Sequence, residues 1–532
     1  MKALLYFAML QTAIAWSSPS ENPPITEEKE IAFSPTIHTL IIAKGDLEIS
    51  PDSEGVISDC LPESAIEELA SRFLGEPIST ETLKDFRESV IQKMEEEGNF
   101  AVASFPEQDV SLGTVMLKVS EPKIEKLDVK GNSWQSTDSY LESLSFSQGD
   151  RLHVDTALND LAWINRNPFH YVEAVVSPGT SPNSVAVELV AKDRFPLRPF
   201  FGADNTGTNL TDQVRIFAGA NWGRAFGKNN MLTYQFTTAP STHKFYAHTG
   251  SYLIFLPWKH EMTFFGGYSH SKPDLVGFSQ QGRSVQASFR YAIPAKPLYG
   301  PTKKTTTFGF DYKNINSNVF FIDSPEVPII AHQVNISQLF FSYQWQRKFM
   351  VKWDLLISPC RLLPNQSPSR YHALRPHSSV RYAYTMLALV DTYYYKHDLS
   401  LAWTLRGQLA TGPLLPSEQF GLGGYDTVRG YEERDFLADN AACLNIEFRS
   451  PKISFFKRDE LIFLTFLDLG GGYNYKSDQE AQKSQFLAGI GPGVRYRIDS
   501  YLSLRADYGF QLHNILGQSD FGRFHLGGYL SY

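Results

Sequence analysis

Residues 423–431 read Gly423-Gly424-Tyr425-Asp426-Thr427-Val428-Arg429-Gly430-Tyr431 and lie between two strand-like runs. The glycines let the chain turn where a Cβ atom would clash. Further along, Phe466-Leu467-Asp468-Leu469-Gly470 has the character of a strand that carries one carboxylate among apolar residues. Such a carboxylate needs water or a cation, and a guanidinium offers a matching planar fork. We predict that Arg429 pairs with Asp468 inside a membrane β-barrel. The alternative is a surface arginine on a glycine-rich hairpin.

Composition narrows the class of protein. The chain has 532 residues, which is too long for a single domain of usual size. Its net charge of -8 argues against a nucleic-acid partner. Aromatic residues make up 14% of the chain, as expected for strands and for the girdles of membrane barrels. The three cysteines, Cys60, Cys360 and Cys443, are too few and too dispersed for a disulfide framework or a metal cluster. We therefore expect no metal and no cofactor.

The N-terminus predicts export. Lys2 precedes an apolar run over residues 3–10, and Ala13-Ile14-Ala15 fits a small-residue cleavage site, so residues 1–15 are expected to be a signal peptide. The alternative is a buried N-terminal helix. Residues 16–35 are rich in Pro, Ser and Glu and predict a flexible leader. No later run of about 18 apolar residues predicts a membrane-spanning helix.

Two α+β units follow, over residues 36–121 and 122–193. Each is expected to run strand, helix, helix, strand, strand, because helical spacing of apolar residues alternates with short strand-like runs. A shared element order suggests an internal repeat. The order resembles the polypeptide-transport-associated (POTRA) domain, and Val129-Lys130-Gly131-Asn132 looks like the end of its first strand. The alternative is two unrelated small domains.

From residue 198 to residue 532 the helical pattern gives way to apolar and polar alternation, with turns rich in Gly, Asn, Pro and Asp. Polar residues such as Arg215, Asn221, Arg505, Asp507 and Gln511 share one face of their strands. This pattern predicts a transmembrane antiparallel barrel with a wet interior, although alternation alone also fits a soluble sandwich. Sixteen strands are expected near 199–205, 213–223, 231–238, 244–255, 259–269, 283–292, 305–313, 335–346, 350–358, 377–386, 398–408, 440–449, 460–472, 485–496, 501–511 and 523–532.

Strand order places the two motifs and the C-terminus. If the first strand leaves the periplasm, the connection between strands 11 and 12 is the sixth external loop. That loop carries Val428, Arg429, Gly430 and Tyr431, whereas Asp468 falls on strand 13. The last residues, 525–532, look like the signal that barrel-assembly machinery reads, with Leu530 where an aromatic residue is more usual.

Together these features resemble the two-partner secretion transporters of the hemolysin and filamentous-haemagglutinin type, within the POTRA-barrel superfamily. The resemblance rests on the POTRA-like pair, the sixteen strands, Val428-Arg429-Gly430-Tyr431 and Phe466-x-Asp468-x-Gly470. It implies a bacterial outer-membrane pore that captures an unfolded exoprotein in the periplasm and passes it to the cell surface. Some members plug the pore with an N-terminal helix. The four prolines of residues 17–35 argue against one here.

Enzyme chemistry finds little support. The chain has no Gly-x-Ser-x-Gly elbow, no His-Glu-x-x-His and no phosphate loop, so we expect no catalytic residue. Gly489-x-Gly491-x-Gly493 falls on a predicted strand, where small residues beside a lumenal loop explain it better than a nucleotide. Two alternative functions stay open: a POTRA-barrel insertase for outer-membrane proteins, and a structural or adhesive surface barrel.

Overall fold

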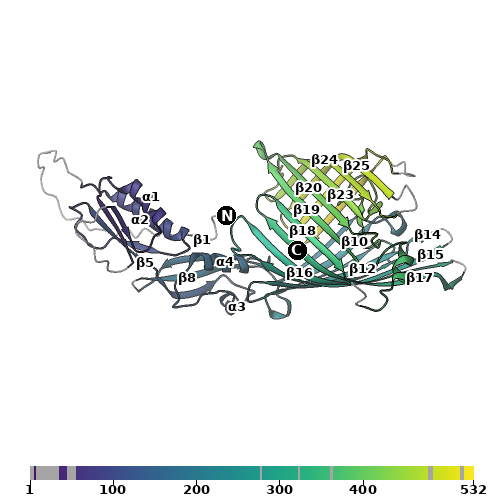
Figure 1. The fold of residues 1–532 in the computed structure, drawn as a ribbon, viewed down its shortest axis with the longest axis horizontal. Coiled ribbons are helices and arrows are strands. Elements are labelled where there is room, and N and C mark those ends of the chain that lie inside the picture. Colours follow the sequence, from purple (N-terminus) through teal and green to yellow (C-terminus); the bar gives the residue numbers. More distant parts are fainter. Residues whose placement is uncertain are drawn as a thin grey trace. The chain divides into compact units, whose positions relative to one another are not determined.

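The computed structural model describes residues 5–6, 35–44, 55–181, 183–275, 278–321, 324–359, 363–476, 483–515 and 521–532. The chain divides into two compact units, residues 1–194 and 195–532 (Figure 1). Of the predicted signal peptide, only the two-residue strand β1 (Leu5–Tyr6) is described, and it pairs in parallel with Ala174 and Val175. The predicted leader, up to residue 34, lies outside the described residues. None of the helices described here is long and apolar enough to cross a membrane.

The first sheet of unit 1 carries two helices. Its strands are β2 (Thr39–Ala43), β3 (Gly55–Ser58), β4 (Val102–Ser104) and β5 (Thr114–Ser120), in the order β3-β2-β5-β4. Helices α1 (Glu63–Phe73) and α2 (Thr80–Glu96) bury Phe73, Phe86 and Met94 against it. Ser79 caps α2 by accepting the Thr82 N–H at 3.0 Å. The prediction missed β3, a strand of four half-buried residues.

The second sheet contains β6 (Lys123–Lys130), β7 (His170–Pro178) and β8 (Ser184–Asp193), with β8 in the centre. Helices α3 (Thr137–Leu141) and α4 (Val154–Ile164) pack Tyr140, Leu161 and Ile164 against it. Gly131 follows β6 with a positive φ of 79°, and a Cβ there would lie 2.5 Å from the Ala191 carbonyl oxygen. The glycine of Val129-Lys130-Gly131-Asn132 is therefore a steric requirement.

Unit 2 is a closed antiparallel barrel, which confirms the predicted fold class (Figure 1). Within the described residues sixteen strands close the barrel, and the two-residue strand β14 (Asp274–Leu275) lies between β13 and β15. The strands are β9 (Leu197–Asp204), β10 (Arg215–Trp222), β11 (Met231–Thr238), β12 (Phe245–Phe255), β13 (Glu261–Ser271), β15 (Phe278–Pro294), β16 (Lys303–Phe321), β17 (Ser324–Gln346), β18 (Met350–Ser358), β19 (Tyr382–Tyr394), β20 (Ser400–Ala410), β23 (Asn440–Arg449), β24 (Asp459–Tyr473), β25 (Ser484–Ile498), β26 (Leu502–Gln511) and β27 (Gly522–Ser531).

The two faces of the strands differ as a membrane barrel requires. On β26, Leu504 and Phe510 are exposed on the outer face, whereas Asp507 is buried on the inner one. The same alternation places exposed Phe463 outside and buried Asp468 inside on β24. At these positions the charged side chains face the lumen and the apolar ones face the lipid, where a charge would be costly.

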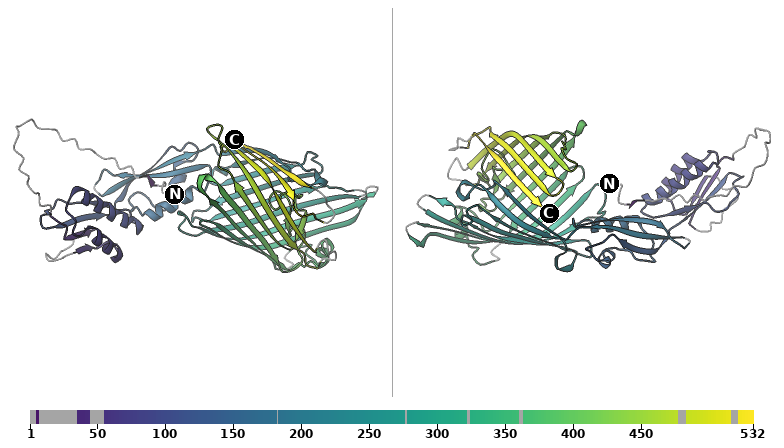
Figure 2. Two further views of the ribbon diagram at one scale, coloured as in Figure 1. Left: turned by 90° about the horizontal axis from the view of Figure 1, so that it is seen from above. Right: turned by 180° about the vertical axis from the view of Figure 1, so that it is seen from behind.

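The predicted strands all have a counterpart, but three were too short. Strands β15, β16 and β17 have 17, 19 and 23 residues, and Figure 2 shows them, in teal, extending past their neighbours. The sequence misled because Asn, Ser and Pro recur over residues 314–334, and such residues usually mark turns. The tenth strand begins at Tyr382 rather than near residue 377, because residues 363–381 form a loop that we call L5.

Two of the described connections, L5 and L6, contain an α-helix and a β-hairpin. L5 contains helix α5 (Pro368–Leu374), whose Tyr371 is fully buried against β17 and donates its hydroxyl to the Asn335 carbonyl at 3.0 Å. The predicted sixth external loop, L6, spans residues 411–439 and contains a small hairpin of β21 (Phe420–Leu422) and β22 (Phe436–Ala438). Both loops therefore have ordered parts that pack against the barrel wall.

Candidate functional site: the L6 loop in the barrel lumen

The tip of L6 is buried inside the barrel. Val428, Arg429 and Tyr431 are at most 3% exposed, although they lie in a loop. Gly423, Gly424 and Gly430 have φ values of 100°, 100° and 103°, so each adopts a backbone conformation that a side chain would strain. The glycines at these positions let the loop fold back to the wall formed by β23–β27.

Arg429 and Asp468 form a bidentate ion pair. The Arg429 Nε donates to Asp468 Oδ2 at 2.7 Å and Nη2 donates to Oδ1 at 2.9 Å. The Arg429 backbone N–H adds a third bond to Oδ2 at 3.1 Å, and the Asn445 amide donates to Oδ1 at 2.8 Å. Because both side chains are almost fully buried, neither charge is screened by water. The two predicted partners are therefore in direct contact.

A wider charge network surrounds the pair. Arg429 Nη1 donates to Glu447 Oε1 on β23 at 2.7 Å and lies 3.7 Å from Asp507 Oδ1 on β26. Arg495 on β25 pairs with Asp507 at 2.8 Å and approaches Glu447 at 3.7 Å. Arg449 on β23 also donates Nη2 to Glu447 Oε2 at 2.6 Å. Three carboxylates thus share three arginines, of which only Arg429 belongs to the loop.

The three residues of the strand motif each contact the loop tip. The Phe466 ring lies under the guanidinium, with its centroid 3.5 Å from the Arg429 Cζ, as a cation–π contact requires. Asp468 holds the same guanidinium. A Cβ on Gly470 would lie 2.7 Å from a Val428 methyl group, so only glycine leaves room for the loop. The strand motif Phe466-x-Asp468-x-Gly470 therefore fits Val428 and Arg429 of the loop in both shape and charge.

Gly430 and Tyr431 bind the neighbouring strands. The Gly430 N–H donates to His525 Nε2 on β27 at 3.0 Å, and Gln511 on β26 donates to the Gly430 carbonyl at 2.8 Å. The Tyr431 hydroxyl donates to the Ala488 carbonyl at 3.1 Å and accepts the Ala488 N–H at 3.2 Å. The whole motif therefore contacts strands on both sides of β25.

Glycines of the wall complete the fit. A Cβ on Gly489 would lie 2.0 Å from the Arg429 carbonyl oxygen, and one on Gly509 would lie 2.4 Å from the Gly430 nitrogen. Gly489 belongs to the Gly-x-Gly-x-Gly run of β25. In the structure this glycine faces the backbone of L6. In the described part of the chain, no group of three or more His, Cys, Asp or Glu side chains is placed to hold a metal ion.

Sequence reasoning missed several residues of this site: Glu447, Asn445, Arg495 and His525. All of them lie on the lumenal face of their strands, and the alternation of polar and apolar residues in the sequence indicates that face. Their contact with L6 was not, because it depends on register. Asp468 is opposite both Asn445 and Gly489, and such pairs follow only from the register of β23, β24 and β25.

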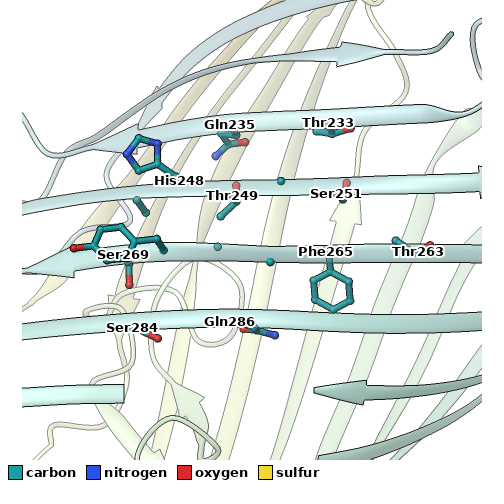
Figure 3. A pocket seen from close by; sticks show the side chains of 15 residues that line it. Thr233, Gln235, His248, Thr249, Ser251, Thr263, Phe265, Ser269, Ser284 and Gln286 are labelled. Carbon is teal, nitrogen blue, oxygen red and sulfur yellow. The ribbon is translucent and has the colours of Figure 1, made fainter. Parts of the chain in front are cut away.

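The other side of the lumen has a different character. Figure 3 shows a hollow lined by β11, β12, β13 and β15. Its lumenal side chains are small or uncharged: Thr233, Gln235, Thr249, Ser251, Thr263, Phe265, Ser269, Ser284 and Gln286. No Lys, Arg, Asp or Glu is among the described residues that line it. The lumen therefore has a charged wall that binds the tip of L6 and, on the other side, a hollow lined by neutral residues, which we call the neutral wall.

Known proteins share this architecture. CdiB from Escherichia coli has a TM-score of 0.71 at 15% identity, covering 96% of this chain and 93% of that chain. CdiB from Acinetobacter baumannii has a TM-score of 0.62 at 16% identity, covering 97% and 95%. BamA from Haemophilus ducreyi lacking POTRA domains 1–3 has a TM-score of 0.56 at 11% identity, covering 88% and 97%. At these identities the likeness concerns the fold.

Sequence comparison goes further. The outer membrane transporter CdiB of Dickeya dadantii (strain 3937) is 21% identical over 415 residues, which are 74% of this chain and 71% of that protein. The model of the family described as haemolysin secretion/activation protein ShlB/FhaC/HecB matches residues 183–496, more than half of the chain. The chain therefore belongs to the ShlB/FhaC/HecB family of haemolysin secretion/activation proteins and is a two-partner secretion transporter of the bacterial outer membrane.

Proposed function

We propose that this transporter captures one unfolded exoprotein with its periplasmic POTRA-like domains, residues 36–121 and 122–193, and moves it through the barrel of residues 198–532. In this proposal the residues bind and position the exoprotein and the loop, and none of them takes part in a chemical reaction. Sheet edges in unit 1 offer unpaired backbone groups to which an extended chain can add as a strand. The C-terminal residues 525–532 would bind the barrel-assembly machinery when the protein inserts.

The observation that carries the proposal is the docked tip of L6. Arg429, together with Asp468 and Glu447, holds the loop in the lumen by side-chain contacts and not by pairing with the strands of the barrel. A loop held by side chains can leave the wall and return. We propose that the docked loop is the resting state and that its release widens the lumen.

The neutral wall of β11–β15 is the proposed path of the exoprotein. An extended chain presents side chains of both charges, and ion pairs with the wall would hold it in place. Thr, Ser and Gln side chains bind any backbone weakly and exchangeably, since the net worth of one hydrogen bond is about 1 kcal/mol. A passing chain would therefore be guided without being trapped.

The test is to delete the protein in its own cell and compare the secreted proteins with those of the parent strain. Loss of one large secreted protein from the medium, restored by the wild-type chain, supports the proposal. A fall in every outer-membrane barrel would instead indicate an insertase. An unchanged medium with altered surface adhesion would indicate a structural barrel.

A further inference from the structure

A second buried charge site holds L6 at its base, on a different part of the barrel wall. The Glu418 side chain is fully buried, and its carboxylate accepts from Lys313 Nζ at 2.8 and 2.9 Å. Gln338 Nε2 donates to it at 2.7 Å, and the Tyr384 hydroxyl donates at 2.9 Å. The donors come from β16, β17 and β19, whereas the tip of L6 binds β23–β27.

The surroundings of this site are shared with L5. Leu414 and Leu415, at the start of L6, lie in one apolar cluster with Tyr371 of α5. Arg375, which follows α5, donates Nη2 to Asp439 Oδ2 at 2.7 Å at the other end of L6. The base of L6 and the helix of L5 therefore form one packed layer on the lumenal face of β17–β20.

We propose that Glu418 is a positioning residue for transport: it anchors the base of L6 to β16–β19 independently of the Arg429 site. The inference rests on the proposed function and adds to it that L6 moves by its tip alone. Residues 423–433, between β21 and β22, would swing out while Glu418 keeps the base in place. The fixed base would then keep the released tip close to Asp468 and Glu447, so that Arg429 can pair with them again.

The chemistry at Glu418 is that of a fixed anchor. Taking a carboxylate out of water is unfavourable unless a cation and hydrogen-bond donors replace the lost water. Here one ammonium and two neutral donors from three strands do so. A surface loop without a positional role would not need a buried charge at its base, because an apolar contact would hold it equally well.

The test uses the full-length protein in planar bilayers with Glu418→Gln, Lys313→Met and the double variant. Each single change leaves one buried charge unpaired, whereas the double variant leaves none. We expect each single variant to raise the fraction of time spent in wide open levels by at least about tenfold, since losing one partner of a buried pair shifts an equilibrium strongly. The double variant should lie closer to the wild type.

Two comparisons separate positioning from folding. Lys352→Met is the matched control, because Lys352 pairs with Asp354 on the same strand, β18, at 3.0 Å. Only heat-modifiable, folded protein is recorded, so that a folding defect lowers the amount of barrel and not its conductance. Arg429→Ala combined with Glu418→Gln should open the lumen more than either change alone, because the two anchors bind different strands.

The result also distinguishes the anchor from the function it serves. Channels of Glu418→Gln and Lys313→Met that match wild type and Lys352→Met would overturn the anchor, whatever the protein secretes. The two experiments can also disagree. If the variants change the conductance but deletion of the protein changes no secreted protein, the anchor is supported and the proposed function is refuted. Equal effects in the single and double variants would show that charge pairing is not the cause.

Discussion

Replacing Arg429 by alanine should release the tip of L6 and leave the barrel folded. The side chain makes three charge-assisted hydrogen bonds, two to Asp468 and one to Glu447, and stacks on Phe466. Its removal leaves Asp468 buried, with the Asn445 amide as a side-chain donor. The strands themselves keep their ladders, because Arg429 belongs to a loop.

The expected size follows from burial. Removing one partner of a buried ion pair costs about 3–5 kcal/mol, mostly because the other charge is left without compensation. Since each 1.4 kcal/mol is a factor of ten, the docked-to-released ratio of the tip should fall by roughly 100-fold or more. Arg429→Lys keeps the charge but lacks the planar fork, so it can reach one carboxylate at a time. We expect it to restore only a minor part of the docking.

The assay combines secretion with single-channel recording. Arg429→Ala should reduce the exoprotein in the medium while barrel level and heat-modifiability stay near wild type, and its channels should be wider and less steady. Lys352→Ala is the control, because Lys352 pairs with Asp354 on the lumenal face of β18 at 3.0 Å and takes no part in the Arg429 or Glu418 contacts described above. Wild-type secretion and wild-type conductance in Arg429→Ala would refute the role of the pair.

Three further outcomes are expected. Removing residues 420–433 should raise conductance and lower secretion, and equal conductance with and without them would place the loop outside the pore. A fragment of residues 36–193 should be soluble, folded and monomeric and should bind the N-terminal region of the exoprotein, as measured by calorimetry; a folded fragment without affinity would place capture elsewhere. The same fragment should lose stability as pH falls below about 6.5, because burial lowers the pKa of His170 in the folded state while the unfolded chain takes up a proton there. A second loss should begin near pH 4.5, because hydrogen bonds from Ser184 and Thr180 lower the pKa of Glu125 to about 2; denaturant titrations from pH 8 to pH 3 test both, and His170→Gln should remove the first.

The sequence predicted the barrel because its evidence is local. On β26 the alternation of Leu504 and Phe510 with Arg505 and Asp507 requires no knowledge of neighbours. The pairing of Arg429 with Asp468 was also readable, since each lies in a short motif and each needs an opposite charge. The same reasoning placed L6 between strands 11 and 12.

What the sequence did not predict depends on contacts made only after closure. Helix α5 has seven residues and no strong apolar face, so Tyr371 becomes a core residue only because β17 presents a lumenal apolar surface to it. Glu418 reads as an ordinary loop carboxylate until Lys313 is brought opposite. The ends of β15–β17 were predicted wrongly for another reason: long pairing between strands that follow each other in the chain overrides local turn signals.

The uneven distribution of charge around the lumen explains why the loop should return after each passage. With the tip docked, Glu447, Asp468 and Asp507 contact three arginines, Arg429, Arg449 and Arg495. With the tip released, the three carboxylates keep only two of these arginines, and like charges at short range repel. The released state is thus the less stable one, while the neutral wall opposite gains nothing from holding the loop. We therefore expect re-docking to be driven by the wall itself, without ATP or a partner to push the loop back.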